Sequence, residues 1–347
     1  MKAYVLNGIN QLNYEEVKEP VLNEGRVLVE VKASGICGSD IPRIFENGTY
    51  HFPTIPGHEF SGIVRKVYAK EQEKWIGKRV GIFPLIPCQK CISCQEKKYE
   101  MCSNYDYLGS RSDGGYAEYV SVPEWNLIEL PDGVSYEAAA MLEPIAVGIH
   151  ALKQINLSCV KSAVVFGCGT IGLLMAQWLR IFGVEKIILV GTKEKQRIMA
   201  EQLQFYDFIN TKTENAVERV LEMTGTEGAD VCIEGTGYSE VLSQCLNCTK
   251  RGGDVLIVGN PHGDIYIDKD TYWKLLRKQL RISGTWNSSY IPELDKDDWR
   301  TSIENIMNGR LKPELQITHR LSFDELDKGL RMMRDKKEYY NKVMLVR

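Results

Sequence analysis

Residues 163–172 read AVVFGCGTIG. The four apolar residues predict a buried strand, and the apolar run 171–182 predicts a helix directly after it. Of the three glycines between them, the first allows a tight turn, the second lets the backbone approach a pyrophosphate, and the third lets helix and strand pack closely. Free N–H groups at a helix start bind phosphate. The stretch therefore predicts a dinucleotide site, rather than a glycine-rich turn that binds nothing. The expected cofactor-binding residues are Gly167, Gly169, Thr170, Ile171 and Gly172.

The chain on either side of this stretch divides into two kinds of region. After residue 158, strand-like and helix-like segments alternate, which predicts a doubly wound parallel sheet. The expected strands are 186–190, 208–209, 231–233, 255–258 and 281–283, and the expected helices are 195–203, 215–223 and 239–249. Residues 1–133 contain short strand-like runs among glycines and prolines, which predicts a mostly-β region. We therefore expect an α/β protein.

Four cysteines lie close together at the spacing CX2CX2CX7C. They are Cys88, Cys91, Cys94 and Cys102. Four thiolates can surround one tetrahedral zinc ion and leave no position open, so the expected role of this zinc is structural. The alternatives are an iron–sulfur cluster or a chance group of reduced thiols.

A second possible metal site combines three ligand types. Cys37, His58 and Glu59 offer a thiolate, an imidazole and a carboxylate, and three protein ligands leave a catalytic zinc with an open position. Ser39 follows the cysteine closely enough to contact an oxygen bound there, and Asp40 is available to orient the imidazole. The alternative is a buried cysteine and a core histidine.

Glu143 is a further candidate ligand. It lies in the apolar stretch 141–145, where a carboxylate is costly unless it is paired or bound to a metal. The hypothesis is that Glu143 binds the same zinc, in exchange with Glu59 or with water. The alternative is a glutamate that faces water at a helix end.

The bulk properties exclude several classes of protein. The net charge of -3 provides no basic field for a nucleic acid. No apolar run has membrane-spanning length, and the first residues turn polar at once, unlike a signal peptide. Ten cysteines in such a chain predict a reducing compartment, so we expect a cytoplasmic protein.

The end of the second expected strand bears on the choice of cofactor. Folds that bind NAD place an acid there, which contacts the adenine ribose and repels a 2′-phosphate. This chain instead has Gly191, Thr192 and Lys193, followed by Glu194, Lys195 and Arg197. A small residue, a hydroxyl and a cation favour NADP over NAD. The alternative is that the cations are ordinary surface charges and that NAD binds without the acid.

Together these motifs resemble the zinc-dependent medium-chain dehydrogenase/reductase family, over essentially the whole chain. Cys37 after Gly35 and the turn 57–59 are similar to the polyol branch of that family. The resemblance implies a GroES-like zinc-binding catalytic domain, residues 1–150 and 286–347, interrupted by a Rossmann domain, residues 151–285. It also implies an active site in a cleft between the domains and a homodimer or homotetramer.

The resemblance further implies a zinc-dependent oxidoreductase. The stretches 38–45, 108–115, 145–148 and 284–287 look most like members that act on a polyol phosphate of the galactitol 1-phosphate type. The expected reaction transfers hydride from a secondary alcohol to NAD(P) and gives the ketose phosphate. The expected catalytic residues are Cys37, Ser39, His58, Glu59 and Glu143, and the expected substrate contacts are Ser39, Arg43, Arg111 and Asn287, with Lys274 as a further phosphate anchor. The alternatives are an unphosphorylated polyol such as sorbitol, another secondary alcohol, or a non-catalytic relative that binds zinc and nucleotide.

Overall fold

The computed structural model describes residues 1–347, which form two compact units. The first unit comprises Met1–Glu143, Ser289–Gly309 and Gln316–Arg347, and the second comprises Pro144–Ser288 and Arg310–Leu315. These bounds differ slightly from the expected ones because two segments pack within the second unit. Trp178 Nε1 donates to the carbonyl oxygen of Ile145 at 3.0 Å, and Lys312 N donates to Gln177 Oε1 at 2.9 Å.

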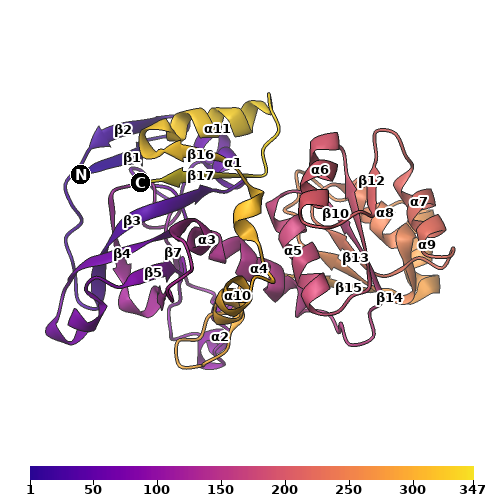
Figure 1. Ribbon diagram of the computed structural model, residues 1–347, viewed down its shortest axis with the longest axis horizontal. Coiled ribbons are helices and arrows are strands. Elements are labelled where there is room, and N and C mark those ends of the chain that lie inside the picture. The colour runs from indigo at the N-terminus through magenta and orange to yellow at the C-terminus, as the bar shows by residue number, and fades with distance from the viewer. The chain divides into compact units, whose positions relative to one another are not determined.

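The first unit is built on a seven-stranded sheet in the order β16-β17-β3-β4-β5-β9, with β8 also paired to β3 (Figure 1). Its strands are β3 (Arg26–Ile36), β4 (Glu59–Val67), β5 (Arg79–Ile82), β8 (Tyr119–Pro123), β9 (Leu127–Glu129), β16 (Ile317–Ser322) and β17 (Lys342–Val346). The two smaller sheets pair β1 (Lys2–Leu6) with β2 (Leu12–Glu16) and β6 (Leu85–Ile86) with β7 (Asp106–Tyr107). The helices are α1 (Asp40–Pro42), α2 (Ile92–Gln95), α3 (Tyr136–Ala140), α10 (Asp298–Met307) and α11 (Leu326–Asp335). The predicted mostly-β region is therefore confirmed.

Strand register brings distant residues together in this unit. β3 and β4 are antiparallel, with Gly35 opposite Glu59, so the end of β3 lies beside the start of β4. Cys37 follows β3 and His58 precedes β4, which places both at the same edge of the sheet. β17 pairs with the other side of β3, with Val343 opposite Ile36, and this brings Lys342 to that edge as well.

The second unit contains the predicted doubly wound parallel sheet, in the order β12-β11-β10-β13-β14-β15. The strands are β10 (Ser162–Phe166), β11 (Lys186–Gly191), β12 (Phe208–Asn210), β13 (Ala229–Glu234), β14 (Thr249–Ile257) and β15 (Arg281–Gly284). The helices are α5 (Thr170–Ile181), α6 (Glu194–Gln202), α7 (Ala216–Met223), α8 (Ser239–Cys248) and α9 (Lys269–Lys278), while α4 (Leu142–Leu152) spans the boundary between the units. The strand order reverses between β10 and β13, which is where folds of this type bind ligands.

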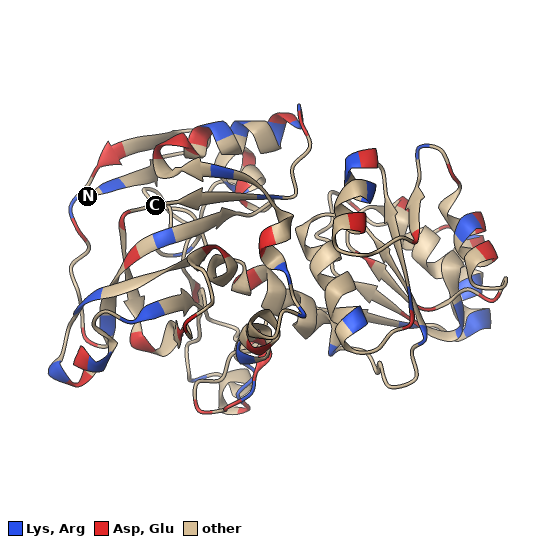
Figure 2. Ribbon diagram, viewed as in Figure 1, with Lys and Arg blue, Asp and Glu red and all other residues tan.

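Charged side chains are distributed over the whole chain. Both signs of charge occur on each unit in Figure 2. No helix is both long enough and apolar enough to cross a membrane.

Candidate active site

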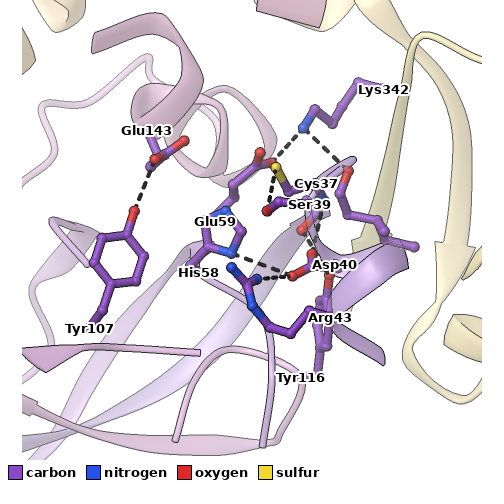
Figure 3. Close-up of polar contacts among 12 residues, drawn as sticks. Cys37, Ser39, Asp40, Arg43, His58, Glu59, Tyr107, Tyr116, Glu143 and Lys342 are labelled. Atoms are coloured by element: carbon purple, nitrogen blue, oxygen red, sulfur yellow. Dashed lines mark hydrogen bonds and ion pairs between the residues drawn. The ribbon is translucent and has the colours of Figure 1, made fainter. Parts of the chain in front are cut away.

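Cys37, His58 and Glu59 meet at the shared edge of β3 and β4 in the first unit (Figure 3). One ligand atom from each residue lies within 4.8 Å of the others. Gly35 makes room for this arrangement, because a Cβ atom there would stand 2.3 Å from Glu59 Oε2. Sulfur, nitrogen and oxygen donors in one group fit zinc.

The carboxylate of Asp40 lies beside the imidazole ring of His58. Its Oδ1 lies 3.5 Å from His58 Nδ1 and accepts from Arg43 Nη1 at 2.8 Å, while Oδ2 accepts from the Tyr116 hydroxyl at 2.6 Å and from Cys37 N at 3.0 Å. Burial alone would raise the pKa of Asp40, but the charges of His58 and Arg43 and these hydrogen bonds lower that pKa below its usual range. An ionised carboxylate beside one ring nitrogen orients the ring, so the other nitrogen is available to a metal.

The same carboxylate affects the protonation of His58. Burial would lower the pKa of His58, but the charges of Asp40 and Cys37 raise it well above the ordinary value. A metal ion would replace the proton at the ring nitrogen that faces Cys37 and Glu59, because a ligating imidazole is neutral.

Lys342 is a buried partner of Glu59 that the sequence analysis missed. Its Nζ donates to Glu59 Oε2 at 2.5 Å and to the carbonyl oxygen of Ile36 at 3.3 Å. The side chains of Lys342 and Glu59 are only 3% and 1% exposed. Burial lowers the pKa of Lys342, but the charges of Glu59 and Cys37 outweigh burial and raise it, so the ammonium form is favoured. The one signal in the sequence was a lysine that opens the otherwise apolar strand 342–346.

Ser39 and Glu143 lie differently with respect to the three ligands. Ser39 Oγ donates to Cys37 Sγ at 3.3 Å, so its hydroxyl is beside the metal group. Glu143 is not in the group of three, and its Oε1 accepts from the Tyr107 hydroxyl at 3.2 Å. Burial raises the pKa of Glu143, and the ring of Tyr107 lies 5.9 Å from that of His58. Tyr107 is therefore a further residue of this site that the sequence analysis did not identify.

The four cysteines of residues 88–102 form a second group in the first unit. Four sulfurs about 2.3 Å from one tetrahedral centre stand about 3.8 Å apart. The distances from Cys91 Sγ to Cys94 Sγ and Cys102 Sγ are 3.6 and 3.9 Å, and Cys88 Sγ lies 4.0 Å from Cys94 Sγ. The sulfur geometry therefore fits one zinc ion.

Backbone groups and aromatic rings support this second group. The N–H groups of Cys94 and Ser103 lower the pKa of Cys91 to about 6, which favours the thiolate, while burial raises the pKa of Cys94 to about 12. The rings of Tyr99 and Trp125 pack against the group and contact each other edge-on at 5.0 Å.

In the second unit, the glycine turn after β10 has the geometry that a dinucleotide needs. Gly167 has a φ of 101°, which allows the tight turn, and a Cβ on Gly172 would stand 1.9 Å from the carbonyl oxygen of Gly167. Gly169 precedes α5, and a Cβ there would meet nothing within 4 Å. The backbone around Gly169 is therefore open to a pyrophosphate, and Thr170 and Ile171 begin the helix with their N–H groups at its positive end.

β11 ends at Gly191, and no acid follows it directly. Glu194 forms an ion pair with Arg197, which also donates to Glu201 at 2.7 Å, so Arg197 is shared by two acids and is not a free cation. Lys193 is exposed at the start of α6, and Lys212, two residues beyond the β12 residue that pairs with Gly191, is exposed as well. Lys212 carried no signal in the sequence because its position depends on the pairing of β11 with β12.

The expected phosphate anchors fall into different environments. Arg43 donates to Asp40 in the first unit. Lys274, on α9, donates through Nζ to Asn247 Oδ1 at 2.5 Å, and Asn287 belongs to the second unit. Arg111, in the first unit, is held between two aromatic rings, with its Cζ 4.0 Å from the Tyr50 centroid and 4.5 Å from the Tyr105 centroid. The Tyr105 ring lies 6.2 Å from that of Tyr107, which borders His58.

Comparison with known proteins gives matches over both units. Residues 23–132 match the model of the alcohol dehydrogenase GroES-like domain, and residues 170–308 match that of zinc-binding dehydrogenase. Galactitol 1-phosphate 5-dehydrogenase of Escherichia coli K12 is 30% identical over 317 residues, which is 91% of each chain. The crystal structure of galactitol-1-phosphate dehydrogenase from Escherichia coli superimposes with a TM-score of 0.91 at 29% identity and full coverage of both chains.

Two further proteins show the range of the similarity. Sorbitol dehydrogenase of Bacillus subtilis 168 is 31% identical over 267 residues, 75% of each chain. A Sinorhizobium meliloti protein described as a zinc-binding dehydrogenase, solved with NADP, has a TM-score of 0.90 at 26% identity and covers 100% and 99% of the two chains.

Proposed function

Because the chain belongs to the zinc-dependent medium-chain dehydrogenase/reductase family, we propose that it oxidises a secondary alcohol of a polyol phosphate, of the galactitol 1-phosphate type, to the ketose phosphate with NAD(P) as hydride acceptor. Membership makes the chain a zinc-type oxidoreductase of the polyol and alcohol dehydrogenases. The phosphorylated substrate rests on one observation in the first unit, namely the position of Arg111.

Arg111 has the properties of an anion anchor. Its guanidinium lies between Tyr50 and Tyr105, and its Nε is buried without a hydrogen-bond partner. His51 Nε2 donates to the carbonyl oxygen of Arg111 at 2.9 Å, and this hydrogen bond holds the main chain at Arg111 in place. The side chains of Tyr50 and Tyr105 also hydrogen-bond this guanidinium, so the donors left for a phosphate are the remaining N–H groups, Nε–H among them.

The zinc site defines the reacting end of the substrate. Cys37, His58 and Glu59 would hold a zinc ion, and Glu143 is the candidate for exchange with Glu59. Zinc supplies Lewis-acid activation of a hydroxyl group when bound. Ser39 would accept the proton of that hydroxyl and pass it on towards solvent, because its Oγ lies beside Cys37 Sγ. Asp40 keeps the imidazole oriented, and Lys342 holds the carboxylate of Glu59 through a hydrogen bond of 2.5 Å.

We further propose two zinc ions per chain, one at Cys37, His58 and Glu59 and a structural one at the four cysteines, with NADP preferred over NAD. The nicotinamide supplies the hydride chemistry when bound. The dinucleotide would lie along the residues from Gly167 to Gly172, with its adenine ribose near Gly191, Thr192 and Lys193. The small residue Gly191 and the exposed lysines near it support the proposal that this site accepts the 2′-phosphate of NADP. All ten cysteines are free, which supports the reducing cytoplasmic compartment.

The proposed assembly is a homodimer or a tetramer built from such dimers. β15 is an edge strand with one unpaired side, and it lies in a segment rich in exposed apolar residues. These are Ile265, Tyr266, Tyr272, Trp273, Leu276, Ile282 and Trp286. A two-fold axis beside β15 would pair two copies of the strand antiparallel and cover this surface.

The test of the substrate is a panel of hexitols and hexitol 1-phosphates assayed with both cofactors. In wild type we expect the phosphates to have the higher kcat/KM. Arg111→Ala should raise KM for a polyol phosphate about tenfold or more and leave the free polyol nearly unchanged, because only the phosphate loses a charge-assisted contact. Arg331→Ala on α11, an exposed arginine paired with Asp327, is the matched control.

Each alternative predicts a different result in this panel. Equal effects of Arg111→Ala on polyol and polyol phosphate would remove the phosphate assignment and favour an unphosphorylated polyol such as sorbitol. No turnover of any secondary alcohol with a zinc-loaded protein would favour the non-catalytic relative.

A further inference from the structure

The side chain of Gln196 occupies the place next to Gly191 where an acid would select NAD. Gln196 lies in the first turn of α6, the helix that follows β11 in Figure 1, and its side chain accepts hydrogen bonds from the loop between them. Its Oε1 accepts from Thr192 N at 2.9 Å and from Lys193 N at 3.0 Å. Because two N–H donors face the same atom, that atom must be the amide oxygen, and the amide nitrogen is left as a donor.

The contacts around Gly191 show why the selecting group is carried by α6. A Cβ on Gly191 would stand 2.8 Å from Gln196 Oε1 and 2.7 Å from Phe208 Cζ. An acid at position 191 therefore has no room unless both side chains move. The space beyond the end of β11 is filled from the helix by a neutral amide.

Neutrality is the property that matters for the cofactor. A carboxylate at this place would keep both N–H contacts, and it would set a negative charge against any phosphate bound over Gly191. Two acids lie on the neighbouring segments, and both are paired. Glu194 pairs with Arg197, and Glu214, which accepts from Asn210 N at 3.0 Å, pairs with Arg219 at 3.1 Å. Lys193 and Lys212 are both exposed on the two loops that border Gly191. The exposed cations on these loops are therefore Lys193 and Lys212, and residue 196 adds no negative charge while it is a glutamine.

We propose that Gln196 is the specificity-determining residue for the 2′-substituent of the adenine ribose, and that its neutral amide admits a 2′-phosphate which a carboxylate in the same position would exclude. This inference rests on the proposed dinucleotide site at the ends of β10 and β11. It assigns the choice of cofactor to a side chain five residues beyond the end of β11.

The test measures binding of two cofactor fragments, adenosine 2′,5′-bisphosphate and 5′-AMP, by calorimetry to the zinc-loaded protein. Gln196→Glu changes the charge while keeping size and hydrogen bonds. Its expected effect is a fall of about tenfold or more in the affinity for the bisphosphate relative to 5′-AMP, since a carboxylate and a phosphate a few ångströms apart repel by that amount even in water. Gln202→Glu, at the exposed last residue of the same helix, makes the same change in net charge and should leave this ratio within about twofold.

A second variant distinguishes an effect of charge from an effect of misfolding. Gln196→Lys loses the hydrogen bonds to the loop and adds a cation, so the ratio should rise instead of fall. The inference would be overturned if folded Gln196→Glu had the same ratio of bisphosphate affinity to 5′-AMP affinity as wild type. It would also be overturned if Gln196→Glu and Gln196→Lys shifted this ratio in the same direction. If wild type binds 5′-AMP better than the bisphosphate while the two variants still shift the ratio in opposite directions, the proposed NADP preference fails and the role of Gln196 stands.

Discussion

Replacing Lys342 by methionine removes the one buried cation that contacts Glu59. The two side chains are 3% and 1% exposed, and Nζ lies 2.5 Å from Oε2. At an effective dielectric constant of about 20, unit charges at that distance attract each other by roughly 7 kcal/mol. Desolvation of both ions offsets much of this attraction, but removal of one partner leaves an uncompensated buried carboxylate, which costs about 3–5 kcal/mol.

The metal state should change the size of this effect. Without zinc, we expect Lys342→Met to lower the free energy of unfolding by about 3–5 kcal/mol. With zinc added, the loss should be smaller, because a bound cation beside Cys37 and His58 then compensates Glu59. The proposed structural zinc at the four cysteines should contribute equally to wild type and variant, so it should cancel in this comparison.

The assay is urea unfolding followed by intrinsic fluorescence, with and without zinc. The control is Lys328→Met on α11, whose exposed pair with Glu325 should contribute less than about 1 kcal/mol in both metal states. Adding Glu59→Gln to Lys342→Met should restore part of the lost stability, because the unpaired charge is then gone. A loss of the same size with and without zinc would refute the idea that Glu59 serves both the lysine and the metal.

Three other results are expected. Cys91→Ser should reduce bound zinc by about one ion per chain and lower Tm, as metal analysis and calorimetry will show, whereas the exposed Cys159→Ser should change neither; full metal content at normal Tm would disprove the structural site. His58→Ala or Cys37→Ser should abolish turnover while 5′-AMP still binds in calorimetry, because the glycine turn belongs to the other unit; lost nucleotide binding with retained turnover would contradict the layout. Ile282→Lys, on the edge strand, should shift sedimentation towards monomer, and an unchanged oligomer would place the interface elsewhere.

Features whose functional residues lie close together in the sequence could be predicted from it. The turn from Gly167 to Gly172 and the cysteines of residues 88–102 lie within short segments, so spacing alone indicates that they converge. The two units and the parallel sheet followed from the change in hydrophobic period near residue 158.

Features that depend on strand register could not be predicted in the same way. Lys342 and Glu59 are 283 residues apart, and they meet only because β17 and β4 flank β3. A polar glutamine in a charged helix, such as Gln196, is ordinary in sequence until its oxygen is seen to cap the loop. Ion pairs could not be predicted either. Arg197 was expected to be a cation available to a phosphate, but it is paired with Glu194.

The position of β17 in its sheet has a consequence for the order in which the protein matures during synthesis. β17 lies between β16 and β3, yet it is translated after the whole of Pro144–Ser288. The nucleotide-binding unit, which is nearly contiguous, can fold while the growing chain is still attached to the ribosome. The sheet of the first unit must wait with residues 33–36 of β3 unpaired on the edge that β17 will occupy, because β8 pairs only with residues 26–30. During that interval the carboxylate of Glu59 has no lysine beside it. A metal ion that reaches Cys37 and His58 before β17 docks would therefore meet a more negative site than the finished enzyme presents.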